Sequence, residues 1–137
     1  MFKKLMVPVD LMHPDILSKA LDVSANLSKT YNAPIVYVGV TEEAPTSVAH
    51  NPSEFQRKMA AFAQQQSEKY GIAAEGIGYT CGDPATDMNE TLLKASEDID
   101  ADLIVIASHV PTFADRLWSS HGGGVASRSK KSVMVLR

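Results

Sequence analysis

The sequence predicts an α/β domain in which helices cover both faces of a five-stranded parallel sheet. Short apolar runs alternate along the chain with longer segments whose apolar residues recur at helical spacing. This alternation is typical of right-handed βαβ crossovers, which place parallel strands side by side. The 137 residues, 45% of them hydrophobic, suffice for one core but hardly for two. We therefore expect a single domain over residues 1–137.

The predicted strands differ in how apolar they are. The run 4–10 is continuously apolar, as expected of a strand buried on both faces, and 101–107 is the most apolar run of all. Residues 33–40 form a second such run, and 132–137 closes the chain. The segment 72–81 alternates poorly and contains two glycines, so it suits an edge strand.

Four helices are predicted between these strands, and the last of them, which starts near residues 122–124, precedes the closing strand. In the first, Pro14 stands at the first helical position, and one face carries Ile16, Ala20, Val23, Leu27 and Tyr31. The second begins at "PSEF", ends at the C-cap position of Gly71, and carries Phe55, Met59, Phe62 and Tyr70. The third has Asp83 as N-cap and Pro84 in its first turn, and its apolar face comprises Met88, Leu92, Ala95 and Ile99.

Composition excludes several classes of function. The formal net charge is −3 and there is no dense basic run, which argues against nucleic-acid binding. The apolar run near the N-terminus is cut short by Pro8 and Asp10, and no segment approaches the roughly 18 apolar residues of a membrane span. A lone cysteine, Cys81, fits a reducing compartment. We expect a cytoplasmic protein whose partners are small molecules or proteins.

The topology rule for parallel sheets places a ligand beyond the carboxyl ends of the strands, where strand order reverses. If the first and fourth strands are neighbours, the loops 10–14 and 108–124 face each other there. They would bring together Asp10, His13, Ser108, His109, Ser119, Ser120 and His121. The glycines 122–124 are either a nest for phosphate or a frayed start of the last helix.

Several motifs resemble those of the universal stress protein family, and in particular its short single-domain members of the "ASHxP" type. They are "VPVD" at residues 7–10, "ADLIVIASH" followed by Pro111, and the closing "SVMVLR". In nucleotide-binding members the fourth strand runs into Gly-x-x-Gly and a later Gly-Ser or Gly-Thr. Here Ala107, Val110 and Ser119 replace those glycines.

The resemblance implies a strand order of 3-2-1-4-5 and a stress-response regulator that binds ATP or AMP, with Mg²⁺ as a candidate companion of the phosphates. Asp10 would hold the adenine or ribose edge, and the backbone of residues 38–40 would recognise the adenine. The implied binding residues are Pro8, Val9, Asp10, Val38, Gly39, Val40, Ala107, Ser108, His109, Val110, Ser119, Ser120, His121 and Gly122. A homodimer would form through Val133, Met134, Val135 and Leu136, and a transporter is a further candidate partner.

Other interpretations compete with nucleotide binding. Asp10 could instead cap the first helix. Neither GxxxxGK[ST] nor GxSxG occurs, and although His109 could act as a base toward a phosphate or Ser120, we expect no rapid catalysis. A transition metal would suit His13, His109 and His121, with Asp10 and Asp115 nearby, but their spacing matches no zinc motif. We therefore expect dispersed polar loop histidines and no metal site. The remaining alternative is a dimeric interaction module that has lost nucleotide binding, using the apolar edge of the last strand. The loop 41–53 and the helix of Phe55 are other candidate contacts of such a module.

Overall fold

The computed structural model describes residues 1–107 and 129–136, which form a five-stranded sheet of order β3-β2-β1-β4-β5. Every pairing between neighbouring strands is parallel. The strands are β1 (Leu5–Pro8), β2 (Ile35–Glu42), β3 (Ala74–Cys81), β4 (Leu103–Ala107) and β5 (Ser132–Leu136). The predicted fold class and strand order are therefore confirmed.

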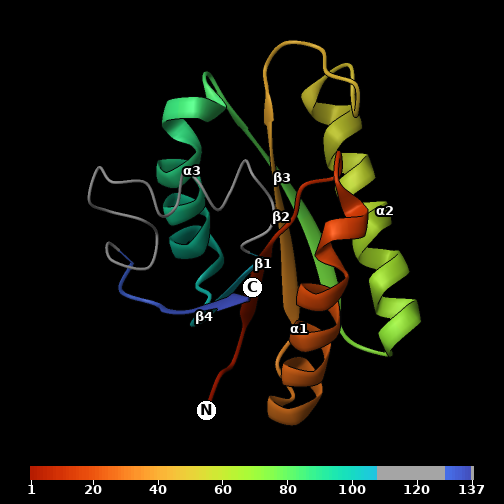
Figure 1. Cartoon of the computed structure of the whole chain (residues 1–137), viewed down its shortest axis with the longest axis vertical. Helices are drawn as coiled ribbons and strands as arrows, with labels where there is room; N and C mark the ends of the chain where they lie inside the picture. Colours follow the sequence, from red (N-terminus) through yellow and green to blue (C-terminus); the bar gives the residue numbers. More distant parts are fainter. Residues whose placement is uncertain (108–128, 137) are drawn as a thin grey trace.

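Helices cover both faces of the sheet (Figure 1). They are α1 (Ser18–Tyr31), α2 (Pro52–Tyr70) and α3 (Pro84–Ile99), and a short 3₁₀ turn, η1 (Pro14–Leu17), precedes α1. Figure 1 shows α1 and α2 on one face of the sheet and α3 on the opposite face. As a result every residue of β1 and of β4 is buried, which confirms that these two apolar runs are central strands.

The buried face of α1 differs from the predicted one. Its buried residues are Ala20, Leu21, Ser24, Ala25 and Ser28. Of the predicted face only Ala20 is fully buried; Val23, Leu27 and Tyr31 are half-buried, and the side chain of Ile16 lies outside those described. The serines tolerate burial because their hydroxyls donate to main-chain carbonyls, that of Ser24 to Leu21 at 3.1 Å and that of Ser28 to Ala33 at 2.5 Å.

Within residues 1–107, the helices α1, α2 and α3 end in the same local structure. A residue with positive φ terminates each helix, and the residue after it donates its N–H to the carbonyl of a serine in the last turn. The residues with positive φ are Asn32, Gly71 and Asp100, and the accepting serines are Ser28, Ser67 and Ser96. This arrangement satisfies carbonyls that a helix end leaves unpaired, and it confirms Gly71 as a C-cap residue.

β3 is an edge strand, as predicted, and packs closely against α2. A Cβ atom on Gly76 would lie 2.1 Å from the carbonyl oxygen of Met59, so only glycine allows the helix to approach this closely. The Gln56 side-chain amide donates to the carbonyl of Gly76 at 2.9 Å and accepts from the N–H of Gly78 at 2.7 Å. Gln56 thus pairs backbone groups that an edge strand would otherwise leave open.

Candidate functional site

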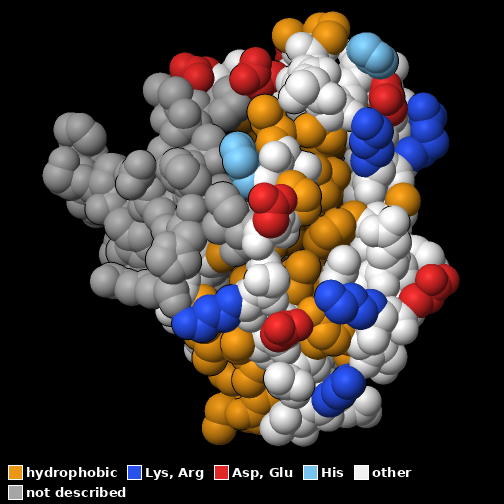
Figure 2. All heavy atoms as spheres, turned by 45° about the vertical axis from the view of Figure 1, so that its right-hand side comes forward, with side chains coloured by type: hydrophobic (Ala, Val, Ile, Leu, Met, Phe, Trp, Pro, Cys, Tyr) orange, Lys and Arg blue, Asp and Glu red, His pale blue; other side chains and the backbone are white. Residues whose placement is uncertain are grey.

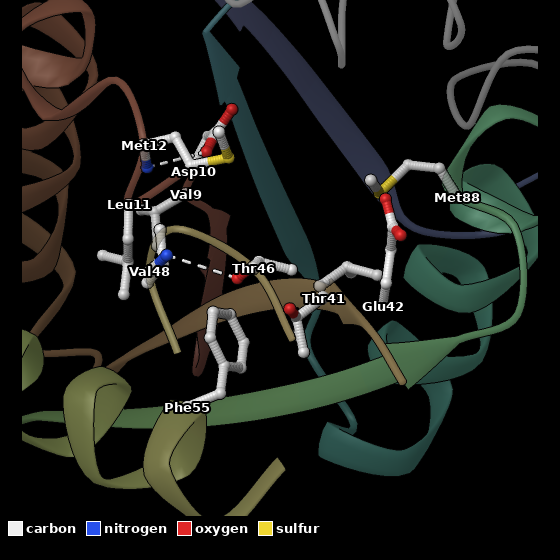
Figure 3. A pocket seen from close by; sticks show the side chains of 11 residues that line it. Val9, Asp10, Leu11, Met12, Thr41, Glu42, Thr46, Val48, Phe55 and Met88 are labelled. Carbon is white, nitrogen blue, oxygen red and sulfur yellow. Dashed lines mark hydrogen bonds between the residues drawn. The ribbon is translucent and has the colours of Figure 1, made fainter. Parts of the chain in front are cut away.

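A cavity of about 120 Å³ lies at the carboxyl ends of β1 and β2. It is open to solvent on one side, and Figure 3 shows its lining side chains coming from both strand ends, the loop after β2, and helices α2 and α3. The lining residues are Val9, Asp10, Leu11, Met12, Val40, Thr41, Glu42, Thr46, Val48, Phe55 and Met88. This is the edge of a parallel sheet at which ligands bind.

Asp10 is held in a fixed orientation at one end of this cavity. Its Oδ1 accepts from the N–H of Met12 at 2.9 Å, and its Oδ2 lies 3.1 Å from Nδ1 of His13. Its own carbonyl accepts from the N–H of His13 at 3.1 Å, which closes a turn over residues 10–13. The side chain is 15% exposed, so most of its surface is in contact with protein. The carboxylate is thereby oriented before any ligand arrives.

The alternative prediction for Asp10 was that its side chain caps the first helix. The N-cap residue of η1 is His13, and no side chain caps the helix there. Asp10 does accept from a nearby N–H, that of Met12, but this bond fastens the turn that precedes the helix. The carboxylate therefore stands at the border between the end of β1 and the cavity, where it can also face a ligand.

The opposite wall is formed by the loop between β2 and α2. The Thr46 hydroxyl oxygen accepts from the N–H groups of Val48 and Ala49, each at 3.2 Å, and the Thr46 N–H donates to the Ala49 carbonyl at 2.9 Å. Lys58 of α2 donates to the carbonyl of Val48. These bonds hold the side chain of Val48 at the cavity, near the ring of Phe55 (Figure 3).

Phe55 packs against the face of β2 and β3 that carries glycine. A Cβ atom on Gly39 would lie 2.8 Å from Cζ of Phe55 and 2.6 Å from Sδ of Met59. Gly39 is thus required for helix packing, and its own atoms do not line the cavity. The Phe55 ring occupies the space that a side chain at Gly39 would fill and borders the cavity with apolar surface.

Three of the sequence-predicted binding residues line the cavity, namely Val9, Asp10 and Val40. Pro8, Val38, Gly39 and Ala107 lie in the adjoining strands without lining it. The others fall outside the described residues: Ser108, His109, Val110, Ser119, Ser120, His121 and Gly122. Their assignment stays a prediction.

Sequence reasoning did not name eight lining residues individually: Leu11, Met12, Thr41, Glu42, Thr46, Val48, Phe55 and Met88. Leu11 and Met12 do belong to the loop 10–14, which was expected to face the ligand. One reason for the omission of the others is that β2 continues to Glu42, two residues beyond the predicted end at residue 40. The polar character of the loop after β2 was a usable signal, because a loop at this edge of the sheet faces the ligand. Met88 was predicted only as a residue of a helix face, whereas the helix of Phe55 was also expected as a contact for a partner.

The cavity combines apolar walls with hydrogen-bond acceptors at its two ends. Valine, leucine, methionine and phenylalanine side chains form most of the wall, while the carboxylates of Asp10 and Glu42 and two threonine hydroxyls supply the polar groups. An apolar slot with a few fixed polar groups is typical of sites for small organic ligands. Carboxylates select ligand groups that donate hydrogen bonds, such as N–H and O–H.

The alternative of a metal site rests largely on residues outside those described. Within residues 1–107 and 129–136, no three or more histidine, cysteine, aspartate or glutamate side chains are arranged to hold a metal ion. His13 lies against Asp10, whereas His109, Asp115 and His121 are outside the described residues.

The surface agrees with the charge pattern of the sequence. On the face shown in Figure 2, acidic and basic side chains are interspersed. This face therefore does not present the continuous basic surface that nucleic-acid binding needs. No helix in the described part of the chain is both long and apolar enough to cross a membrane.

Comparisons with known proteins agree on one family. The sequence model of the Universal stress protein family matches residues 1–137. None of the curated proteins compared with the chain matches it.

Solved structures of this family share the fold. A family member from Burkholderia pseudomallei is 23% identical, with a TM-score of 0.68 over 98% of this chain and 95% of that one. The universal stress protein from Archaeoglobus fulgidus in complex with dAMP is 18% identical, with a TM-score of 0.65 over 98% of each chain. A family protein from Arabidopsis thaliana with AMP bound is 17% identical, with a TM-score of 0.61 over 98% of this chain and 90% of that one.

Proposed function

The chain belongs to the universal stress protein family, and on this premise we propose that it binds an adenine nucleotide, ATP or AMP, at the carboxyl ends of β1, β2 and β4. The observation that carries the proposal is the cavity beside Asp10. Its volume of about 120 Å³ is below the roughly 300–1,000 Å³ of a complete ligand pocket, so it suits one end of a nucleotide. Two structural neighbours have dAMP and AMP bound, which supports the same ligand class here.

The strand order suggests how the nucleotide lies. β1 stands between β2 and β4, and the cavity opens at the β1 and β2 ends. We place the base in the cavity, with the backbone near Val40 along its edge, and the ribose next to Asp10. The phosphates then extend toward the end of β4, where Ala107 is followed by the predicted binding residues Ser108, His109, Val110, Ser119, Ser120, His121 and Gly122. Mg²⁺ would accompany the phosphates of ATP.

The proposed role is that of a cytoplasmic stress-response regulator that changes state with nucleotide binding and does not turn the nucleotide over rapidly. A regulator needs only that the bound and free states differ, and binding by itself stabilises the folded chain in proportion to ligand excess. The fixed carboxylate of Asp10 gives such a site one oriented acceptor for the ribose hydroxyls.

The test is a thermal-shift titration of the wild-type protein and an Asp10→Ala variant with Mg-ATP and with AMP. We expect the wild-type melting temperature to rise with ligand and that of Asp10→Ala to stay constant, because the variant lacks the acceptor. Asp15→Ala is the matched control, since Asp15 is an exposed carboxylate of the same segment that does not line the cavity. An equal ligand-induced shift in Asp10→Ala and Asp15→Ala would contradict the placement of the site.

A second candidate function is a dimeric interaction module without nucleotide. The observation in its favour is β5, an edge strand whose Val133, Met134 and Leu136 are half-buried against the core. Its outer backbone groups could pair with a second copy of the strand through Val133, Met134, Val135 and Leu136, or with a partner such as a transporter. A dimer in sedimentation experiments, together with no thermal shift from any nucleotide, would favour this function.

A further inference from the structure

We propose that Glu42 determines which base the site accepts, by accepting a hydrogen bond from the exocyclic amine of that base. This inference rests on the proposed nucleotide-binding function and adds a residue that selects the ligand.

Glu42 occupies the end of the cavity opposite Asp10. It is the last residue of β2, and Figure 3 shows its side chain next to Met88, across the cavity from Asp10. Because β2 lies on the side of β1 away from β4, the strand end that carries Glu42 is farther than the β1 end, with Asp10, from the expected phosphate region. The negative charge of Glu42 also disfavours phosphate there. The base is therefore the part of the nucleotide that reaches Glu42.

The carboxylate of Glu42 has capacity to bind a ligand. In the part of the chain that the structure describes, it takes part in no hydrogen bond or ion pair, whereas Asp10 already accepts from Met12 and lies against His13. Glu42 is exposed at the rim of the cavity, so a ligand can reach its carboxylate without any change in the surrounding structure.

The chemistry of a carboxylate fits an amine. An ionised carboxylate only accepts hydrogen bonds, and the exocyclic amine of adenine donates them. Bonds to a charged acceptor are stronger than those between neutral groups, and the apolar surface of Met88 and Val40 beside the carboxylate reduces competition from water. A base without the amine leaves Glu42 without a donor and should bind more weakly.

The test compares AMP with purine riboside 5′-monophosphate, which differs from AMP only by lacking the amine. Dissociation constants are measured by calorimetric titration for the wild-type protein, Glu42→Ala and Glu43→Ala. We expect the wild type to bind AMP about tenfold more tightly than the analogue, and Glu42→Ala to bind both with similar affinity. Glu43→Ala removes the same charge one residue away, outside the cavity lining, and should keep the tenfold preference.

The possible results distinguish a failure of the role of Glu42 from a failure of nucleotide binding itself. If Glu42→Ala keeps the wild-type preference, or if the wild type shows no preference, Glu42 does not select the base although nucleotide binding stands. If the wild type binds neither nucleotide, both the inference and the proposed function are wrong.

Discussion

Gly76 is the residue at which α2 and β3 come closest. An added Cβ would meet backbone, the carbonyl of Met59 at 2.1 Å, and a helix backbone cannot rotate away as a flexible side chain can. We expect Gly76→Ala to lower the free energy of unfolding by about 1–3 kcal/mol, the usual cost of overpacking, in urea denaturation. Gly82→Ala is the control, because its nearest neighbour would be Asp87 at an ordinary 3.7 Å. Equal stability of the two variants would refute the close approach.

The raised pKa of Tyr70 makes the free energy of unfolding decrease at alkaline pH. Burial raises the pKa of its phenol to about 12, helped by the hydrogen bond that the hydroxyl donates to Asp22 of α1 and by the charge of that carboxylate. Between pH 10 and pH 12 the unfolded chain loses this proton while the folded chain keeps it, so the free energy of unfolding falls as pH rises.

The prediction for Tyr70 concerns the slope of stability with pH. In denaturant unfolding series, Tyr70→Phe should fall less steeply than the wild type above pH 10. Tyr37 and Tyr79 also have raised pKa values, chiefly because they are buried, so part of the fall will remain in the variant. Parallel curves for the two proteins between pH 10 and pH 12 would show that Tyr70 does not contribute.

At the scale of elements, the start of α2 is fixed by two reciprocal hydrogen bonds. The side chain of the N-cap residue Asn51 accepts from the N–H of Glu54 at 2.8 Å, and the Glu54 carboxylate accepts from the N–H of His50 at 2.9 Å. The same His50 bond lowers the pKa of Glu54. This start matters for function, because Phe55 lies in the first turns of α2 and borders the cavity.

Removing the N-cap of α2 should destabilise the start of this helix, and with it the part of the cavity wall that Phe55 forms. We predict that Asn51→Ala lowers the free energy of unfolding by about 1 kcal/mol, as measured by chemical denaturation. Asn51→Asp keeps the accepting oxygen and should stay near the wild type. A loss of stability of the same size in both variants would mean that the cap is not the cause.

The elements show which parts of the fold a sequence can predict. β1 and β4 are continuous apolar runs, and such runs have few alternatives to a central parallel strand. The face of α1 was harder to predict, since Ser24 and Ser28 look polar and are buried only because local carbonyls satisfy their hydroxyls. The spacing of apolar residues gives no information about such hydrogen bonds.

For the molecule as a whole, the position of the candidate cavity could be predicted better than the residues that line it. The strand order and the position of Asp10 at the end of β1 follow from the alternating pattern, from the rule for parallel sheets and from the family motifs. Thr46, Val48 and Phe55 reach the cavity through the folding of one loop and the close packing of α2 on glycine. Contacts of this kind depend on three-dimensional distances that local sequence does not encode.

Calorimetric titration of the purified protein with AMP would decide whether this chain binds an adenine nucleotide. We expect saturable binding of one nucleotide to each chain. Absence of saturable binding at AMP concentrations up to about 1 mM, where even weak complexes form, would contradict it.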